Sequence, residues 1–214
     1  MAARVLIIGL NYSPEHTGIA PYTAGMARAL REEGWDARVI TGLPHYPQWR
    51  VHEGYSHRRA AHEEIDGVPV LRVPHPVPHD AGQLRRLGME IVFGLRAATA
   101  AWGDPDAVVV VSPALFSSAI VRVRAALSRT PVIAWVQDIY TAGLTETGAA
   151  SGPVARVMRG IESTFLRSCQ GVVVIHDRFS DYLRREMAVP ARRISTVRNW
   201  THISQTPSVD TDEL

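Results

Sequence analysis

Residues 4–22, RVLIIGLNYSPEHTGIAPY, carry the pattern that decides the fold. The run at residues 5–9 is continuously apolar, which is typical of a strand buried on both faces of a parallel sheet. A polar loop containing Gly18 follows, and the next residues have the pattern of a helix that ends at Gly34. A strand, a loop and a helix in this order indicate the first unit of an α/β domain.

The alternation of apolar runs with helical patterns continues along the chain. Further strand-like runs lie at residues 37–41, 61–65, 68–73, 107–112, 132–136, 171–175 and 194–197. Helical patterns cover residues 82–102, 114–128, 153–168 and 178–187. An alternation of this length favours a doubly wound α/β fold, with a mostly parallel sheet flanked by helices. Ligands in such folds bind beyond the carboxyl ends of the strands.

The composition fits one main globular domain. A length of 214 residues suffices for one sizeable α/β domain, and 46% hydrophobic with 21% charged residues is usual for a soluble protein. The last stretch, THISQTPSVDTDEL at residues 201–214, is polar and has no apolar period. We therefore expect a Rossmann-like domain over residues 1–203 and a polar linker over residues 204–214.

Charge and cysteine content exclude several classes of protein. All 23 basic residues are arginines, and 21 acidic residues leave a formal net charge of +2, too small a surplus to indicate nucleic-acid binding. The single cysteine, Cys169, forms no internal disulfide and no cysteine pair for a metal. The first strand leaves no room for a signal peptide, and no apolar run reaches the roughly 20 residues that span a bilayer. We expect a cytoplasmic protein.

Gly18 is the first candidate for a binding role. Glycine at a strand-to-helix turn lets the backbone approach a ligand closely, and the helix N-terminus presents free N–H groups, which together suit a diphosphate. The glycine-rich dinucleotide fingerprint is absent. The residues alone therefore leave open whether Gly18 contacts a phosphate or only forms a tight turn.

Four loops together resemble a known family. They are NYSPEHTGIAPY at 11–22, TGLPHYPQWRVHEGY at 41–55, WVQDIY at 135–140 and VRNW at 197–200. In this order they resemble the N-terminal, acceptor-side domain of GT-B fold glycosyltransferases of the family-four type. The most similar members are retaining enzymes that build bacterial surface polysaccharides, including colanic-acid-type enzymes. The resemblance runs from about residue 4 to residue 203.

The resemblance implies an activity and its partners. The chain would be the N-terminal half of an enzyme that moves a sugar from a nucleotide-diphosphate donor to a glycan or polyprenyl-diphosphate-linked acceptor, with retention of configuration. A C-terminal donor domain, which would begin after RNWTHI, is missing from the sequence. The fragment alone would therefore be poorly active. The nucleotide sugar is a substrate, and neither a cofactor nor a metal is expected.

The resemblance also gives the first loop a role. Family members commonly have two adjacent glycines whose amides meet the donor diphosphate, and Thr17 and Gly18 occupy that place here. The implied diphosphate-binding residues are Gly18, Thr17 and Ile19. Thr17 is equally suited to cap the following helix.

Asp138 and Gln137 are the catalytic candidates. AWVQD places this polar pair just beyond a buried strand, where substrates bind in α/β folds. The resemblance implies that the loop lies near the anomeric carbon and the acceptor hydroxyl. A carboxylate there can accept or orient the acceptor's proton. The alternative is that Asp138 caps a turn.

The loop at residues 43–55 supplies the main acceptor-binding candidates. His45, Tyr46 and Trp49 are ring side chains on a long loop, and such groups suit sugar stacking and hydrogen bonding. The alternative is a loop folded on its own rings. Six of the nine histidines lie between His45 and His79, but their spacings match no metal-ligand pattern.

Three further polar residues follow strands. Ser112 and His176 are candidate acceptor contacts at carboxyl ends, although Asp177 beside His176 is favoured as a helix cap. Asn199 lies where the family crosses between domains, so it is expected to contact either the hinge or a ligand.

The helical pattern at 82–102 suggests a membrane contact. Its predicted core face consists of Leu84, Leu87, Ile91, Leu95, Ala98 and Trp102. The opposite face places Met89 and Phe93 among Arg85, Arg86 and Arg96, an arrangement that suits the anionic inner leaflet. The alternative is that Met89 and Phe93 contact a neighbouring element.

Two other functions compete with the transferase hypothesis. A non-catalytic Rossmann-like module that partners a separate catalytic chain remains an alternative. A nucleotide-dependent oxidoreductase or epimerase is disfavoured, because the glycine fingerprint is missing and Thr41 and Gly42 replace the acid expected after the second strand.

Overall fold

The first strand, β1, lies in the middle of an eight-stranded sheet. The computed structural model describes residues 2–79, 83–146 and 152–200, so the predicted linker at 204–214 lies outside the described residues. The sheet order is β3-β4-β2-β1-β5-β6-β7-β8, and only β3 is antiparallel to its neighbour. The strands are β1 (Arg4–Gly9), β2 (Asp36–Thr41), β3 (Ala61–Ile65), β4 (Val68–Arg72), β5 (Ala107–Val111), β6 (Val132–Val136), β7 (Gly171–Val174) and β8 (Ile194–Thr196).

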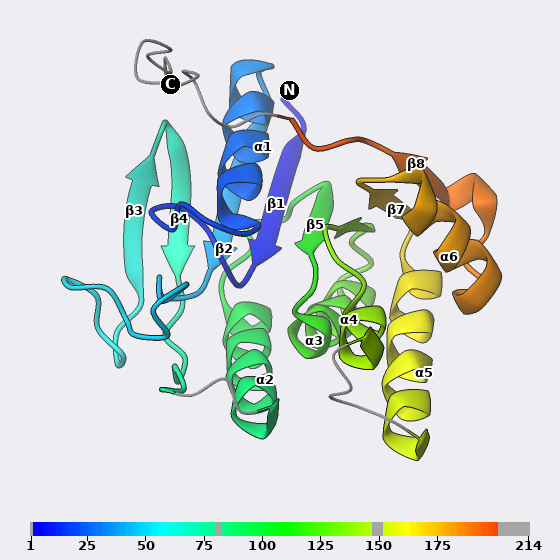
Figure 1. The fold of residues 1–214 in the computed structure, drawn as a ribbon. Coiled ribbons are helices and arrows are strands. Elements are labelled where there is room, and N and C mark those ends of the chain that lie inside the picture. Colours follow the sequence, from blue (N-terminus) through cyan, green and yellow to red (C-terminus); the bar gives the residue numbers. More distant parts are fainter. Residues whose placement is uncertain (1, 80–82, 147–151, 201–214) are drawn as a thin grey trace, which may run out of the picture.

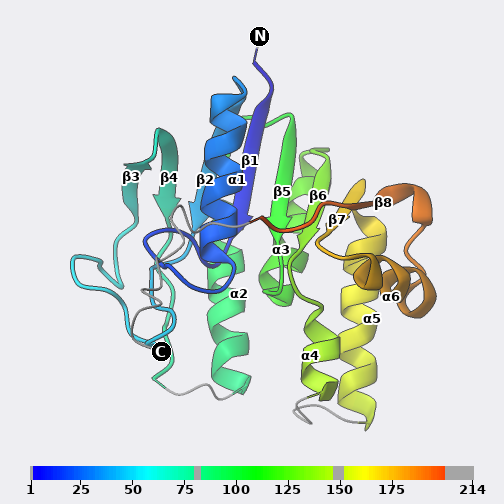
Figure 2. The ribbon, with the colours of Figure 1, turned by 45° about the horizontal axis from the view of Figure 1, so that its top comes forward.

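Helices cover both faces of the sheet, as Figures 1 and 2 show. The described helices are α1 (Ala20–Glu32), α2 (Gln83–Thr99), α3 (Leu115–Leu127), α4 (Tyr140–Glu146), α5 (Gly152–Ser168), α6 (Asp177–Met187) and the 3-10 turn Ala191–Arg193. Residues of α1 share one hydrophobic core with the sheet, and residues of α2, α3, α5 and α6 share the other. The predicted doubly wound, mostly parallel α/β fold is confirmed; α4 was not expected.

The β1 run explains why the sheet forms around it. Five of its six residues are buried, because β2 and β5 pair with it in parallel on either side. Ile7, for example, lies in register with Val39 on β2 and Val109 on β5. Burial on both faces is why the run is continuously apolar instead of alternating.

The orientation of α2 corrects the sequence analysis. Met89 and Phe93 are only 2% and 1% exposed and face the core, whereas Leu84 and Leu95 are 84% and 52% exposed. The prediction that Met89 and Phe93 face a membrane is therefore wrong, and the alternative contact with a neighbouring element is right. The helix is apolar on two sides. The side with Gly94 is the buried one, because the missing side chain at Gly94 lets α3 approach closely.

Two predicted helix caps are also wrong. Thr17 does not cap α1, because the N-cap is Ile19, two residues further on, and no side chain bonds to its N–H groups. His176, not Asp177, caps α6: its Nδ1 accepts a hydrogen bond from the backbone N–H of Arg178 at 3.0 Å. Asp177 has already entered the helix.

Two glycines of α2 give a matched test of this packing. A Cβ at position 94 would lie 2.7 Å from the Cα of Ser117, whereas a Cβ at position 88 would meet nothing within 4 Å. We expect Gly94→Ala to lower the free energy of unfolding by about 1–3 kcal/mol through overpacking. Gly88→Ala should raise it by about 0.5–1 kcal/mol, because alanine favours a helix. Urea denaturation measures both; equal effects of the two variants would contradict this packing of α2 on α3.

Candidate functional site

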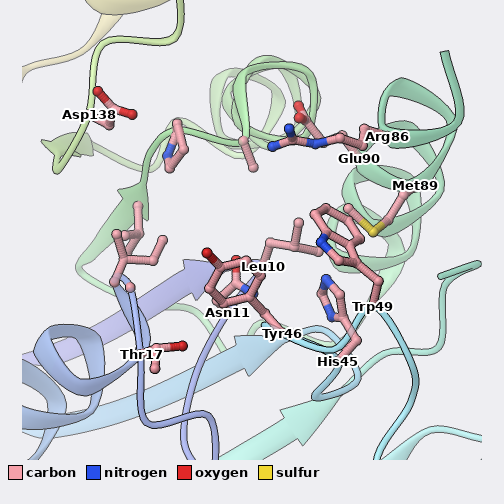
Figure 3. Close-up of a pocket in the computed structure, with 15 residues that line it drawn as sticks. Leu10, Asn11, Thr17, His45, Tyr46, Trp49, Arg86, Met89, Glu90 and Asp138 are labelled. Atoms are coloured by element: carbon pink, nitrogen blue, oxygen red, sulfur yellow. The ribbon is translucent and has the colours of Figure 1, made fainter. Parts of the chain in front are cut away.

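A pocket of about 260 Å³ lies at the carboxyl ends of the central strands. Its walls come from the loop after β1, the loop after β2, helix α2 and the loops after β5 and β6. Figure 3 shows Thr17, His45, Trp49, Arg86 and Asp138 arranged around the same space, although they are far apart in the sequence. The ligand position expected for a doubly wound sheet therefore holds a pocket.

The first loop contributes all three of its predicted residues to the pocket. Thr17, Gly18 and Ile19 line it, directly before the start of α1. Gly18 has φ of +63°, a backbone conformation that glycine adopts without strain. Its α-carbon faces the ring of Tyr46, since a Cβ there would lie 3.6 Å from that ring. The tight turn expected of Gly18 is present, whereas its close approach to a ligand stays a prediction.

Glu15, which was not among the predicted site residues, fixes the first loop against the second. Its buried Oε1 accepts hydrogen bonds from the backbone N–H groups of His45, at 2.7 Å, and Tyr46, at 2.8 Å. Its Oε2 accepts another from Asn11 Nδ2 at 2.9 Å. One carboxylate thus satisfies donors from both loops, which a buried charge requires. No motif distinguishes this glutamate in the sequence.

Two buried histidines support the second loop. His45 Nδ1 donates to the carbonyl of Leu43 at 2.8 Å. His75 Nδ1 donates to the carbonyl of Pro76, so its Nε2 is the atom that accepts from Leu43 N–H at 3.0 Å. Burial lowers the pKa of His75 to about 4, so this ring is neutral at physiological pH. His45, Tyr46 and Trp49 all line the pocket, and their rings also contact one another. The loop is therefore folded on its own rings, and sugar binding by these residues stays a prediction.

Helix α2 adds two charged side chains that the sequence analysis did not propose for the site. The Arg86 guanidinium lies 5.3 Å from the centre of the Trp49 ring. Glu90 is buried, and its Oε2 accepts a hydrogen bond from the backbone N–H of Phe116 at 3.1 Å. Burial raises the pKa of Glu90 to about 7. The expected orientation of α2 concealed both residues, because it turned this side of the helix outward.

The two catalytic candidates have different positions. Asp138 lines the pocket, and its Oδ1 accepts from the N–H of Ile139 at 2.8 Å, so it also holds a turn. Gln137 is buried outside the pocket lining, where its Oε1 accepts from Asn199 Nδ2 at 2.9 Å. Trp200 stacks on Trp135 beside this contact, with ring centres 6.3 Å apart. The chain segment that holds Asn199 is thus fixed to the end of β6.

Ser112 and His176 lie outside the pocket lining. The Ser112 hydroxyl donates to the carbonyl of Asp138 at 2.9 Å, and His176 caps α6. Within residues 2–79, 83–146 and 152–200, no group of three or more metal-binding side chains gathers. In the same part of the chain, none of the helices combines the length and apolarity that crossing a bilayer requires.

Comparison with known sequences gives consistent matches. Residues 17–200 match the glycosyl transferase 4-like domain. The chain is 34% identical over 212 residues to the Escherichia coli (strain K12) protein named as the colanic acid biosynthesis glycosyl transferase WcaI. This alignment covers 94% of the chain and 51% of the relative. The chain therefore spans about half the length of the curated relative it matches.

Solved structures show the same fold. The catalytic domain of starch synthase IV from Arabidopsis thaliana, bound to ADP and acarbose, superposes with a TM-score of 0.64 at 13% identity, over 93% of this chain and 52% of that one. Arabidopsis thaliana UGT89C1 complexed with quercetin gives a TM-score of 0.54 at 13% identity, over 91% and 50% of the two chains. At these identities the likeness concerns the fold alone.

The role of Glu15 is testable. Glu15→Ala leaves two N–H donors without their acceptor, at a cost of about 1–3 kcal/mol each. We expect amide hydrogen exchange in residues 43–50 to become faster, while Glu53→Ala, an exposed change near the same loop, leaves it unaltered. Unchanged exchange in Glu15→Ala would show that the loop holds its shape without this carboxylate.

The raised pKa of Glu90 predicts a pH dependence of stability. Between its ordinary pKa of 4.5 and about 7, the folded chain binds more protons at Glu90 than the unfolded chain does, so this group's contribution to stability falls as pH rises. Glu90→Gln keeps an acceptor for Phe116 but removes the titration. From pH 5 to pH 8 the variant should therefore gain about 2–3 kcal/mol relative to wild type in urea denaturation. If the difference in unfolding free energy between Glu90→Gln and wild type stayed constant from pH 5 to pH 8, the raised pKa of Glu90 would be contradicted.

Proposed function

The chain belongs to the glycosyl transferase 4-like family, and on this basis we propose that it is the acceptor-binding half of a retaining glycosyltransferase of the hexosyltransferase type. A sugar moves from a nucleotide-diphosphate donor to a glycan or lipid-linked acceptor during surface polysaccharide synthesis at the cytoplasmic side of the membrane. The name of the E. coli relative supports the polysaccharide role. A second domain, absent from these 214 residues, supplies most of the donor affinity in this proposal.

The observation that carries the proposal is the convergence of chemically distinct groups on one pocket. Gly18 offers exposed backbone at the N-terminal end of α1, Trp49 offers a ring face, and Arg86 and Asp138 offer opposite charges. Backbone N–H groups and arginine suit phosphates, aromatic rings suit sugars, and a carboxylate suits a hydroxyl.

The proposed reaction assigns a task to each group. The acceptor hydroxyl attacks the anomeric carbon from the face that the donor diphosphate leaves, and the bond to the diphosphate breaks. Asp138 orients the hydroxyl, and its proton passes to an oxygen of the departing diphosphate. N–H groups around Gly18 stabilise the charge that develops on the departing diphosphate. Trp49 and Tyr46 hold the acceptor sugar, and Arg86 binds an anionic group such as an acceptor phosphate. No metal takes part in this proposal.

Gly18 gives the sharpest test, because another positive-φ glycine serves as its control. Gly18 and Gly54 both have positive φ, but only Gly18 lines the pocket. In the natural reading frame that contains this chain, Gly18→Val should lower kcat by about 100-fold or more. Valine is strained at this positive φ, so the turn shifts and its backbone N–H groups no longer point at the developing charge, which costs as much as losing a charge-stabilising donor. Gly54→Val, which imposes similar backbone strain, should leave kcat near the wild-type value.

The assay measures transfer of radiolabelled sugar from a panel of nucleotide sugars to lipid and glycan extracts. Circular dichroism first establishes that both variants fold. Wild-type turnover in folded Gly18→Val would remove Gly18 from the site. Absence of transfer by the folded wild type with every donor and extract would overturn the proposed function.

A further inference from the structure

Two side chains of α2, Arg86 and Glu90, lie one helical turn apart on the wall of the pocket. In Figure 3 they stand on the side of the pocket opposite Thr17, which belongs to the loop of Gly18. A cation and a carboxylate at this spacing often pair with each other. Within residues 2–79, 83–146 and 152–200, however, Arg86 forms no ion pair, and its guanidinium lies 5.3 Å from the centre of the Trp49 ring. The charge of Arg86 is therefore left for a ligand to balance.

The carboxyl group of Glu90 has one oxygen bound to the protein and one that is not. Oε2 accepts the hydrogen bond from the N–H of Phe116, whereas Oε1 has no hydrogen-bond partner among the described residues. The side chain is only 4% exposed, yet it lines the pocket, so Oε1 is the atom that can reach a ligand there. Burial raises the pKa of this carboxyl group from 4.5 to about 7. Near neutral pH the acid form, which carries an O–H donor, is therefore within reach.

The two groups together select one class of ligand. A metal cation would be repelled by the guanidinium of Arg86. A sugar hydroxyl can contact either group, but it would leave the guanidinium without a counter-charge. A phosphate has oxygens enough to accept hydrogen bonds from both groups, and it brings the negative charge that Arg86 lacks. Beside an ionised Glu90 the same phosphate would be repelled, so it fits this place only when Glu90 is protonated.

We propose that Arg86 and protonated Glu90 form a subsite for a phosphate group of the acceptor. The guanidinium donates N–H groups to the phosphate oxygens, and the carboxylic acid donates its O–H to another oxygen of the same phosphate. When the phosphate meets an ionised Glu90, the proton comes from solvent, so binding takes up a proton. The subsite rests on the anion-binding role proposed above for Arg86, and it adds to that role a second donor and a dependence on pH.

Other ionisable groups surround this subsite, and the test has to separate them from Glu90. They are His45, His75, Asp138 and Tyr140. Burial and the charge of Glu90 raise the pKa of Tyr140 to about 12, and burial lowers the pKa of His75 to about 4, so both stay neutral between pH 6 and pH 8.5. His45 and Asp138 line the pocket together with Glu90, so a variant of Glu90 itself is needed to assign the titration.

An NMR titration of the isotope-labelled 214-residue chain with sulfate tests the proposal. Sulfate has the shape of a phosphate, and its own charge does not change between pH 6 and pH 8.5. The carboxyl resonance of Glu90, identified by its absence in Glu90→Gln, should titrate near pH 7 without sulfate. With saturating sulfate the midpoint should rise by about one pH unit or more, whereas sodium chloride at the same ionic strength should not raise it in this way.

The affinity for sulfate should change with pH in the reciprocal sense. Because binding requires the proton, affinity should fall about tenfold or more from pH 6 to pH 8.5. In Glu90→Gln the side-chain amide can accept from Phe116 and donate to the anion at every pH. Its affinity for sulfate should therefore stay near the wild-type value at pH 6 over the whole range.

Adjacent arginines provide the matched control. Arg86→Gln should abolish the effect of sulfate on Glu90, whereas Arg85→Gln, the same change at a residue outside the pocket lining, should preserve it. Gly18→Val separates the two possible sources of the phosphate. An acceptor subsite keeps its affinity for sulfate in this variant, whereas loss of binding would place the anion at the proposed donor position and overturn the acceptor subsite. Circular dichroism establishes that each variant folds.

Three further results would overturn the subsite. They are absence of sulfate binding at pH 6, a Glu90 midpoint that saturating sulfate leaves unchanged, and a pH dependence that persists in Glu90→Gln and so belongs to His45 or another group. Since no step measures sugar transfer, any of these results leaves the proposed function standing. Absence of transfer in the radiolabel assay, with the sulfate results as expected, would instead overturn the function and leave an anion site.

Discussion

The buried carboxylate of Glu15 is the interaction on which the pocket depends. It accepts hydrogen bonds from the backbone of His45 and Tyr46 and from the side chain of Asn11, and so joins the loop after β1 to the loop after β2. Neither loop has regular secondary structure to hold it. With these hydrogen bonds in place, the backbone at Gly18 lies beside the Tyr46 ring in the pocket wall. The sheet positions the starts of both loops, and the Glu15 carboxylate fixes the distance between them.

A second buried carboxylate, that of Glu90, joins two elements at another wall of the pocket. Glu90 bonds to the start of α3 while lining the same pocket, so it ties α2 to α3 beside Arg86. Gly94, one turn further along α2, allows the close packing of the two helices that this contact requires. The packing that buries Met89 and Phe93 is also what leaves Leu84 and Leu95 outside. The geometry of this wall of the pocket therefore depends on the orientation of α2.

Sequence patterns predicted the strands well because each has one strong signal. A run such as β1, buried on both faces, cannot be polar anywhere, and its loops carry the family resemblance. The orientation of helix α2 could not be predicted in the same way, because apolar residues occupy two of its sides. Only the close contact of Gly94 with α3 determines which side is buried. The same difference between local patterns and distant contacts applies to the site residues. Thr17, Gly18, His45, Trp49 and Asp138 were found on loops after strands, whereas Glu15, Arg86 and Glu90 depend on contacts between elements distant in sequence.

The central claim is that the pocket above β1 binds the substrates of sugar transfer. A crystal structure of the protein in its natural reading frame, with a nucleotide sugar and an acceptor analogue bound, tests this directly. The account predicts a donor phosphate within hydrogen-bonding distance of the backbone N–H groups around Gly18, and an acceptor sugar against Trp49. Substrates bound elsewhere, with this pocket empty, would contradict it.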